Sequence, residues 1–338
     1  MKKIGIIGAT GYTGEELLKT LARHDAVEVD FVTSEQQSDT PLVEVFPHLP
    51  MYQHLSFCQV KESVTRDVDL VFTCLHAGES VKWAAQFLER DIKVIDLGSD
   101  FRFKSVQDYS DWYHMPHSHP ELLPNSAYGL TEWYREEIRA AQVVGNPGCY
   151  PTCVLLPLLP FIQGKLLCSA PVIVDAKSGV SGAGKKASEV THYVSVNENL
   201  SPYKVGREHR HVGEMEKEIR TFGGEQKIVF VPHLTPLTRG MLSTTYVQLI
   251  EERSKSDLLD VLQNSYKNEP FVRVLSNGLP TMKMAQNSNY CFIGLEKIAD
   301  SNSVILFSAI DNLGKGASTQ AVQNMNVMLG FKETQALL

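Results

Sequence analysis

The chain has 338 residues, 43% of them hydrophobic, and a formal net charge of −7. This length favours two domains, and the negative charge excludes a general attraction to nucleic acid or to an acidic membrane surface. No window approaches the roughly 20 apolar residues of a membrane span, no signal-peptide pattern is present, and the six cysteines form no Cys-x-x-Cys pair. We therefore expect a cytoplasmic protein without membrane or nucleic-acid partners.

Short apolar strands alternate with helical segments over the first 147 residues. Strands are expected at residues 3–9, 27–34, 68–75, 92–98 and 141–146, and helices at residues 13–24 and 78–90. Alternating strands and helices indicate α/β architecture with a parallel, doubly wound sheet of the Rossmann type.

The pattern changes after the middle of the chain. Longer and often alternating strands are expected at residues 171–179, 227–234, 241–250, 271–275, 290–298 and 303–311, with helices at 214–222 and 257–268. This order predicts an antiparallel or mixed sheet in an α+β domain. A last helix carries Ala321, Val322, Met325 and Met328 at helical spacing. We expect residues 1–147 and 313–338 to form the first domain, with residues 148–312 inserted as a catalytic and oligomerisation domain.

A glycine-rich turn, "GATGYTG", follows the first strand and opens the first helix. Glycines allow a tight turn and a close approach of the backbone to a pyrophosphate, which then meets the helix N-terminus. The alternative is a plain strand–helix turn. The cofactor contacts expected here are Gly8, Thr10, Gly11, Tyr12, Thr13 and Gly14. The second strand ends at Ser34 and Glu35, which do not discriminate between NAD and NADP, since the serine suits a 2′-phosphate and the acid repels one.

The heptapeptide "NPGCYPT" places Cys149 between a tight turn and a predicted helix. One interpretation is a small buried hydrophobe, the commonest fate of a free cysteine. The other is a nucleophile, because a helix N-terminus favours the thiolate. A thiol of that kind attacks an acyl carbon, and a bound nicotinamide then reduces the thioester to an aldehyde, with help from a proton donor and from anion-binding groups.

Groups suited to those tasks occur elsewhere in the chain. "REHRHVGEME" supplies His209, His211 and Glu214; the last two are three residues apart and share a helix face, so the carboxylate is expected to orient the ring of His211. Anion-binding groups are expected in "SDFR", "SGVSGAGKK" and "PHLTPLTRG", since arginine grips phosphate or carboxylate with two parallel bonds. The cluster His114, His117 and His119 has no completing ligand nearby, so no metal is expected.

Taken in order along the chain, "GATGYTG", "LGSDFR", "YGLTE", "VGNPGCYPT", "DAKSGVSGAGKK", "REHRHVGEME", "FVPHLTPLTRG" and "DNLGKGASTQAVQNMN" resemble the N-acetyl-γ-glutamyl-phosphate reductases, relatives of the aspartate-semialdehyde dehydrogenases. The resemblance implies that Cys149 is the nucleophile and that His211 transfers the proton, with His209 as the alternative. Further cofactor contacts are implied at Ser34, Ser178, Gly179 and Asn312. Substrate contacts are expected at Arg102, Asn146, Lys185 and Arg239.

The resemblance also implies NADP(H) as cofactor, N-acetyl-γ-glutamyl phosphate as substrate in arginine biosynthesis, and a homodimer or homotetramer. Glu35 stands where the family often has an arginine. Three alternatives stay open: reduction of an acylated α-aminoadipyl phosphate in lysine biosynthesis, which is one methylene longer, an aspartate-semialdehyde dehydrogenase, and a cofactor-binding sensor without catalysis.

Overall fold

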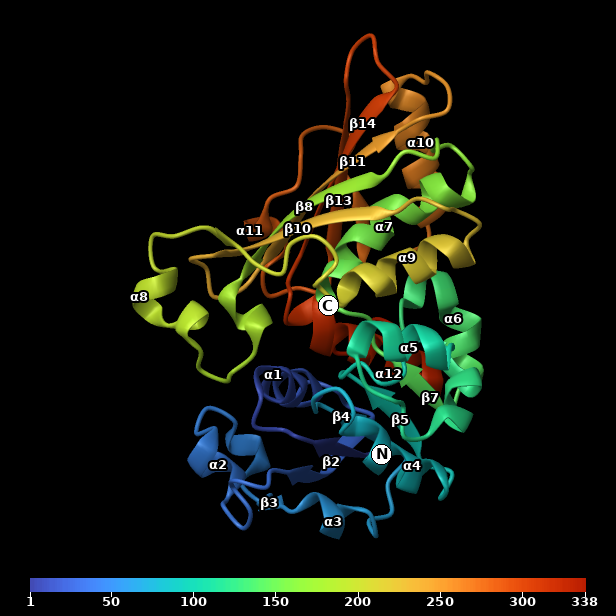
Figure 1. Ribbon diagram of the computed structural model, residues 1–338. Helices are drawn as coiled ribbons and strands as arrows, with labels where there is room; N and C mark the ends of the chain where they lie inside the picture. Colours follow the sequence, from blue (N-terminus) through green and yellow to red (C-terminus); the bar gives the residue numbers. More distant parts are fainter. The chain divides into compact units, whose positions relative to one another are not determined.

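The computed structural model describes all 338 residues, and the chain divides into two compact units (Figure 1). Unit 1 comprises Met1–Pro147 and Ala317–Leu338, and unit 2 comprises Gly148–Gly316. The return to unit 1 lies four residues beyond the expected boundary at residue 313, because Asp311 in unit 2 holds the amides of Gly314 and Gly316. No helix has both the length and the apolar character needed to cross a membrane.

Unit 1 contains a seven-stranded sheet in the order β3-β2-β1-β4-β5-β7-β6, and every strand pairing in it is parallel. The strands are β1 (Lys2–Ile7), β2 (Val27–Thr33), β3 (Phe57–Cys58), β4 (Leu70–Thr73), β5 (Lys93–Asp96), β6 (Ser126–Tyr128) and β7 (Val143–Gly145). The order reverses between β1 and β4, which is where such sheets bind ligands at the carboxyl ends of their strands. The predicted Rossmann-type sheet is confirmed, with β3 and β6 as additional short strands.

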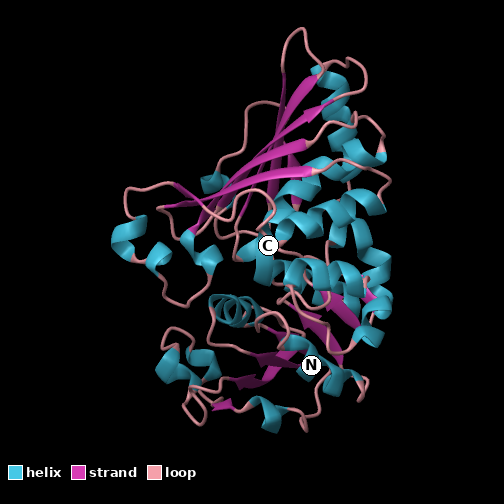
Figure 2. Cartoon of the chain, viewed as in Figure 1, coloured by secondary structure: helices cyan, strands magenta, loops and turns pink.

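The helices of unit 1 cover this sheet (Figure 2). They are α1 (Tyr12–Leu21), α2 (Leu42–Val45), α3 (Val60–Ser63), α4 (Ser80–Leu88), α5 (Val106–Tyr113), α6 (Thr131–Ala140) and α12 (Thr319–Leu329). The last helix belongs to this unit, as expected, and packs on α6 and α1. Its apolar stripe was predicted, but residues 319–328 are buried on all sides, so its polar side chains bond within unit 1.

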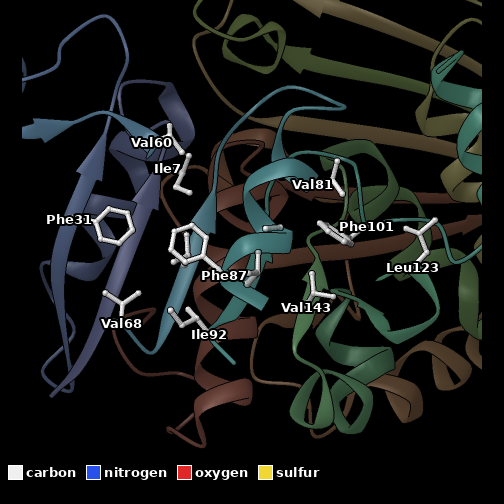
Figure 3. Close-up of a cluster of buried hydrophobic side chains, with 13 residues drawn as sticks. Ile7, Phe31, Val60, Val68, Val81, Phe87, Ile92, Phe101, Leu123 and Val143 are labelled. Carbon is white, nitrogen blue, oxygen red and sulfur yellow. The ribbon is translucent and has the colours of Figure 1, made fainter. Parts of the chain in front are cut away.

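One hydrophobic cluster of unit 1 shows why these segments fold together (Figure 3). Ile7 from β1, Phe31 from β2 and Val143 from β7 meet Val81 and Phe87 from α4, all nearly inaccessible to solvent. The alternation of β2 and the helical spacing of α4 turn these side chains to the same interface. The carboxyl ends of the strands are thereby held in fixed register.

Unit 2 contains a mixed seven-stranded sheet in the order β12-β13-β14-β11-β8-β10-β9. The strands are β8 (Val172–Gly179), β9 (Ser201–Pro202), β10 (Ile228–Thr235), β11 (Met241–Gln248), β12 (Val272–Val274), β13 (Cys291–Lys297) and β14 (Ser303–Ile310). The pairs β8–β10 and β12–β13 are parallel, whereas the others are antiparallel. The expected α+β architecture is confirmed.

Helices pack on one face of this second sheet, while the other face carries exposed apolar side chains. The packed helices are α7 (Cys149–Gln163), α9 (His211–Thr221), α10 (Lys255–Tyr266) and α11 (Met282–Ala285). The short helix α8 (Tyr193–Val196) is largely exposed and contacts the turn at Glu189–Thr191 instead. The central one, α7, touches β11, β13 and β14 as well as α9 and α10, and residues 150–162 are all buried. The cysteine helix is thus the core of unit 2, and only its two end residues, Cys149 and Gln163, approach solvent.

Candidate active site

The glycine-rich turn of unit 1 connects β1 to α1 at the point where the sheet order reverses. Gly8 has a φ of +78°, and a Cβ there would lie 2.7 Å from the carbonyl oxygen of Cys74, which follows β4. A Cβ on Gly14 would lie 2.4 Å from the carbonyl oxygen of Ala9, so this glycine lets α1 pack closely on the strand. Gly11 is the N-cap and supplies no side chain to the first turn. This cradle fits the pyrophosphate of a dinucleotide.

The other expected cofactor residues of unit 1 lie around the same turn. Thr10 and Thr13 belong to it, and Tyr12 begins α1 with a partly exposed side chain. Ser34 lies at the carboxyl end of β2, buried, with its N–H donating to the carbonyl of Cys58. Glu35 follows, and its Oε1 accepts a hydrogen bond of 3.0 Å from the N–H of Val60 at the start of α3.

The segment "SDFR" forms a buried turn in unit 1. The Asp100 carboxylate accepts hydrogen bonds from the N–H groups of Gly78 (2.7 Å) and Val81 (3.0 Å) and so holds the start of α4. The Arg102 guanidinium is also buried and donates through Nε to the carbonyl oxygen of Asn146 at 2.8 Å. A substrate contact at Arg102 stays a prediction. The observed hydrogen bond of Arg102 fixes the backbone that leads to the cysteine.

Asn146 is held by unit 1 on every side. Its N–H donates to the carbonyl of Asp96 at 2.8 Å, and its side chain donates to the carbonyl of Ala317 and accepts from Asn324 Nδ2, both at 3.0 Å. Only 1% of Asn146 is exposed. The predicted role as a substrate ligand is untested, but these contacts make Asn146 the anchor of the turn three residues before Cys149.

Cys149 is the first residue of α7 in unit 2, as the sequence predicts, and its side chain is half-buried. The N-cap, Gly148, has extended φ and ψ and no side chain to bond the first turn, and Pro151 has no N–H. The backbone donors of this turn are therefore those of Cys149 and Tyr150. Such donors stabilise a thiolate or an oxyanion.

Cys153, one turn further along α7, is a different kind of thiol. It is fully buried, and its Sγ lies 3.2 Å from Ser308 Oγ and 3.4 Å from the Ser308 carbonyl oxygen. Burial raises the pKa of this thiol to about 12. Cys153 therefore has the role of a small buried hydrophobe, which was one of the two interpretations of Cys149 from the sequence.

His211 lies directly against the turn that precedes Cys149. A Cβ on Gly148 would be 2.4 Å from His211 Nε2, so only glycine leaves room for the ring. His209 Nδ1 accepts a hydrogen bond of 3.2 Å from the His211 N–H, and the two ring centroids are 4.6 Å apart. The structure therefore places both predicted histidines at the start of α7.

The two histidines differ in their capacity to carry a proton. His209 is enclosed by the rings of Tyr150, Tyr203 and Phe230. Burial, with smaller contributions from Lys204 and Arg210, lowers its pKa to about 3. His209 therefore stays neutral near pH 7 and is a poor proton acceptor there, which favours His211 for proton transfer.

Glu214 is fully buried on α9 and contacts the same turn. Its Oε1 accepts a hydrogen bond of 2.8 Å from the N–H of Gly148. The expectation from helical spacing, that Glu214 orients His211, stays a prediction. The observed bond gives the carboxylate a second task, because it fixes the residue that precedes the nucleophile.

The remaining predicted residues of unit 2 lie at the ends of β8, β10 and β14. Gly179 follows Ser178 on β8, and a Cβ there would be 2.8 Å from the Arg239 Cα. Asn312 donates to Ser181 Oγ at 2.9 Å and accepts from the Gly240 N–H at 2.8 Å. Ser178 is 1% exposed. The structure thus joins Ser178, Gly179, Arg239 and Asn312, whereas Lys185 lies in an exposed stretch of chain.

Sequence reasoning missed two residues of unit 2. Asp311 is fully buried, and its Oδ2 accepts a hydrogen bond of 2.7 Å from Arg239 Nε. A Cβ on Gly316 would be 2.8 Å from the Cβ of Cys149, so this glycine forms a wall beside the cysteine. Both lie in "DNLGKGA", a segment in which only Asn312 was predicted. An aspartate at the end of an apolar strand and before a glycine-rich turn was the available signal.

The histidine cluster of unit 1 has structural contacts. His117 is buried and its Nε2 lies 3.0 Å from the carbonyl oxygen of Asp100, and burial lowers its pKa. His119 Nδ1 lies 3.0 Å from Glu121 Oε1 on the surface. The structure contains no group of three or more His, Cys, Asp or Glu side chains arranged to hold a metal ion.

Comparison with known proteins extends these observations. Residues 3–141 match the semialdehyde dehydrogenase NAD binding domain, and residues 149–312 match the semialdehyde dehydrogenase dimerisation domain. Solved aspartate semialdehyde dehydrogenases share the fold: that of Vibrio cholerae has a TM-score of 0.74 at 20% identity over 98% of both chains. The Candida albicans structure with NADP has a TM-score of 0.72 at 14% identity, over 97% of this chain and 98% of that one.

Curated relatives match from end to end. A protein of Moorella thermoacetica named N-acetyl-gamma-glutamyl-phosphate reductase is 44% identical, and one of Methanocaldococcus jannaschii with the same name is 42% identical. Each alignment covers 100% of this chain and 98% of the relative. Together with a glycine cradle for a dinucleotide and a cysteine at an uncapped helix start, this similarity shows that the chain belongs to the N-acetyl-γ-glutamyl-phosphate reductase family.

Proposed function

We propose that this protein reduces N-acetyl-γ-glutamyl phosphate to N-acetylglutamate 5-semialdehyde with release of phosphate, as a step of arginine biosynthesis. The observation that carries the proposal is Cys149 at the open start of α7 with His211 Nε2 against the preceding glycine. NADPH, bound at the glycine-rich turn of unit 1, supplies the hydride. All six cysteines are free thiols, which suits the reducing cytoplasm where we place the reaction.

The chemistry assigned to this chain begins at the sulfur. His211 takes the proton of the Cys149 thiol, the thiolate attacks the γ-carbonyl carbon, and the carbon–oxygen bond to phosphate breaks as phosphate leaves with that proton. After hydride reaches the thioester carbon, the tetrahedral oxyanion collapses and expels the thiolate, which gives the aldehyde. Backbone N–H groups at the start of α7 stabilise the oxyanion in both steps.

Arginine side chains are assigned to the anionic groups of the substrate. Arg239 is the ligand that unit 2 contributes, and Arg102, Asn146 and Lys185 are the other assigned residues. Ser178, Gly179 and Asn312 are assigned to the nicotinamide end of the cofactor. Guanidinium groups hold phosphate or carboxylate oxygens through paired hydrogen bonds.

The test of the covalent step omits the cofactor. The acyl phosphate alone acylates the enzyme and releases a burst of up to about one phosphate per site, followed by slow hydrolysis. Mass spectrometry is expected to find the acyl group on Cys149 and not on Cys153, the buried matched thiol. Cys149→Ser removes both the burst and the steady state. A burst that survives this substitution, or an adduct on Cys153, would refute the mechanism.

The cofactor assignment is NADPH in preference to NADH. Ser34 suits a 2′-phosphate, and the Glu35 carboxylate is bonded to the Val60 N–H, which draws its charge toward the start of α3. We expect kcat/KM to be higher with NADPH, and a higher value with NADH would contradict the role of Ser34. Glu35→Arg improves NADPH use only if residue 35 faces the 2′ position, so the variant reports where that side chain points.

We assign a homodimer to the protein, with a homotetramer as the larger alternative, through the open face of the second sheet. Ile173, Val229 and Tyr246 are neighbours in register on β8, β10 and β11, and each is more than 40% exposed. They border a shallow apolar depression of about 440 Å³ within the matched dimerisation domain. Ile173→Lys is expected to give monomers in analytical ultracentrifugation, whereas Val190→Lys, at an exposed valine outside the sheet, keeps the wild-type mass.

A further inference from the structure

Asp311 is a buried carboxylate at the end of β14 that no step above uses. Its Oδ2 accepts hydrogen bonds from Arg239 Nε at 2.7 Å and from the Asn287 N–H at 2.6 Å. Its Oδ1 accepts from the N–H groups of Leu313 at 3.0 Å and Gly314 at 3.1 Å. Four donors on one inaccessible carboxylate, all within unit 2, make it a junction between two pieces of the site.

The first piece is Arg239, the anion ligand assigned to unit 2. Its side chain is 19% exposed, and its partner Asp311 is fully buried. The backbone of Arg239 is held as well, since its carbonyl accepts from Gln286 Nε2 at 2.6 Å and its Cα lies against Gly179. A charge-assisted bond to Nε fixes the plane of the guanidinium and therefore the direction of its other donors.

The second piece is the backbone that lies beside the nucleophile. The Asp311 carbonyl accepts from the Gly316 N–H at 2.9 Å, while its carboxylate holds the amides of the two residues after Asn312. These bonds fold the turn so that Gly316 meets Cys149, with 2.8 Å between a built Cβ and the cysteine Cβ. The position of this wall therefore depends on the same carboxylate that holds Arg239.

We propose that Asp311 is a positioning residue that sets the place of the anion-binding arginine relative to the wall of the cysteine site. The part that concerns Arg239 rests on the proposed function, because it takes this arginine as a ligand of the substrate. The part that concerns Gly316 and Cys149 needs no substrate. The two parts are therefore measured separately.

The experiment uses the full-length protein in four variants: Asp311→Asn, Arg239→Gln, the double variant, and Glu333→Gln as a matched control. Glu333 is a carboxylate of unit 1 that holds Arg135 at 2.9 and 3.2 Å, so its loss imitates a broken carboxylate–arginine pair away from unit 2. KM and kcat are measured with N-acetyl-γ-glutamyl phosphate. The rate of Cys149 alkylation by iodoacetamide is followed from pH 5 to 9 by mass spectrometry.

Asp311→Asn is expected to raise KM by about tenfold to a hundredfold, the effect of losing a hydrogen bond to a charged group. In the Asp311→Asn background, Arg239→Gln raises KM by a much smaller factor than it does in the wild-type protein, because the two residues act as one unit. The alkylation profile shifts in Asp311→Asn and not in Arg239→Gln. Glu333→Gln lowers thermal stability while KM and alkylation stay at wild-type values.

The proposal is overturned if Asp311→Asn keeps the wild-type KM and alkylation profile, or if the two substitutions multiply in KM. Asp311→Glu decides the matter should the asparagine variant not fold, because it keeps the charge and displaces it by one methylene; wild-type values in that variant overturn the proposal as well. A wild-type enzyme that does not turn over the acyl phosphate would instead refute the proposed function, and the alkylation comparison would still test the contact with Cys149.

Discussion

Two helices of this protein begin in the same way and serve different chemistry. The N-cap of α1 is Gly11, with φ −74° and ψ 166°, and the N-cap of α7 is Gly148, with φ −67° and ψ 154°. Both glycines are extended, and neither helix has a side chain that bonds its first turn. The N-cap of each helix therefore supplies no side chain to the backbone N–H groups of the first turn, where negative charge is favoured.

The surroundings of the two helix starts differ. At α1 the preceding turn is a glycine cradle, which suits a phosphate chain that arrives from solution. At α7 a thiol of the chain stands at the helix start: Cys149 is the first helical residue, and Glu214 accepts a hydrogen bond from the N-cap N–H. His211 lies against the N-cap and Gly316 lies beside Cys149. Both helix starts favour a negative charge, and they differ in the groups that surround them.

The largest expected effect concerns the side chains around α7. His211→Asn is expected to lower kcat by about 10²–10⁴-fold, the usual contribution of a positioned proton-transfer group. His209→Asn costs less, because the ring of His209 is neutral and orients its neighbour. Steady-state rates at saturating substrate measure both variants. A larger loss for His209→Asn would exchange the two roles.

The wall beside the nucleophile comes next in size. Gly316→Ala places a Cβ 2.8 Å from the Cys149 Cβ, which forces the thiol or the turn to move. We expect kcat to fall by about 10²-fold, as for a misplacement of about 1 Å, while the Kd of NADPH stays unchanged. Gly164→Ala is the control at the other end of α7, where the nearest contact is 3.1 Å. An equal loss in the control would remove the special role of Gly316.

The corresponding change at α1 affects binding instead of rate. Gly8→Ala is strained at φ +78° and approaches the Cys74 carbonyl at 2.7 Å, so the cradle has to open. We expect the Kd of NADPH to rise by about tenfold, since a lost or displaced hydrogen bond to a charged group is of that order. Fluorescence titration measures this value. Gly223→Ala has a similar φ of +83° with open space around it, and it should lower stability without altering the Kd.

The smallest effect is one of stability. Burial lowers the pKa of His209 to about 3 from its ordinary value of 6.5, so the unfolded chain binds the extra proton first. The contribution of His209 to the free energy of unfolding is therefore fully present above pH 6.5. It is lost as the pH decreases toward 3, by up to about 1.4 kcal/mol per pH unit. In His209→Asn this decline disappears. Urea unfolding at pH 7.5 and pH 5 checks it, and equal declines in wild type and variant would contradict the shifted pKa.

Much of this architecture followed from local pattern. The strands of both sheets, the glycine turn and the helix that begins at Cys149 all have signals within a few residues, because turn chemistry and hydrophobic period are local properties. The short strands β3, β6 and β9 were missed. They are two or three residues long, and their pairing depends on the finished sheet more than on their own sequence.

The parts of the site that escaped prediction depend on tertiary register. Spacing on α9 suggested Glu214 beside His211, but packing of α9 on α7 also brings its carboxylate to the Gly148 N–H. Asp311 and Arg239 are 72 residues apart in the chain, and no local pattern pairs them. Asn146 belongs to the motif "NPGCYPT" and could be singled out from it. Its contact with Asn324, which lies 178 residues away, forms only when the last helix is in place.

The position of this last helix in the chain has a consequence for folding during synthesis on the ribosome. Unit 2 is one continuous stretch of chain, whereas unit 1 lacks α12 until residues 319–329 have been made. Until then the carbonyl oxygen of Gly129 and the hydroxyl of Thr131 lack the hydrogen bonds that the side-chain amides of Gln320 and Asn324 donate to them. Unit 1 is therefore the first to leave the exit tunnel and the last to complete its fold, and Cys149 is synthesised before unit 1 is complete.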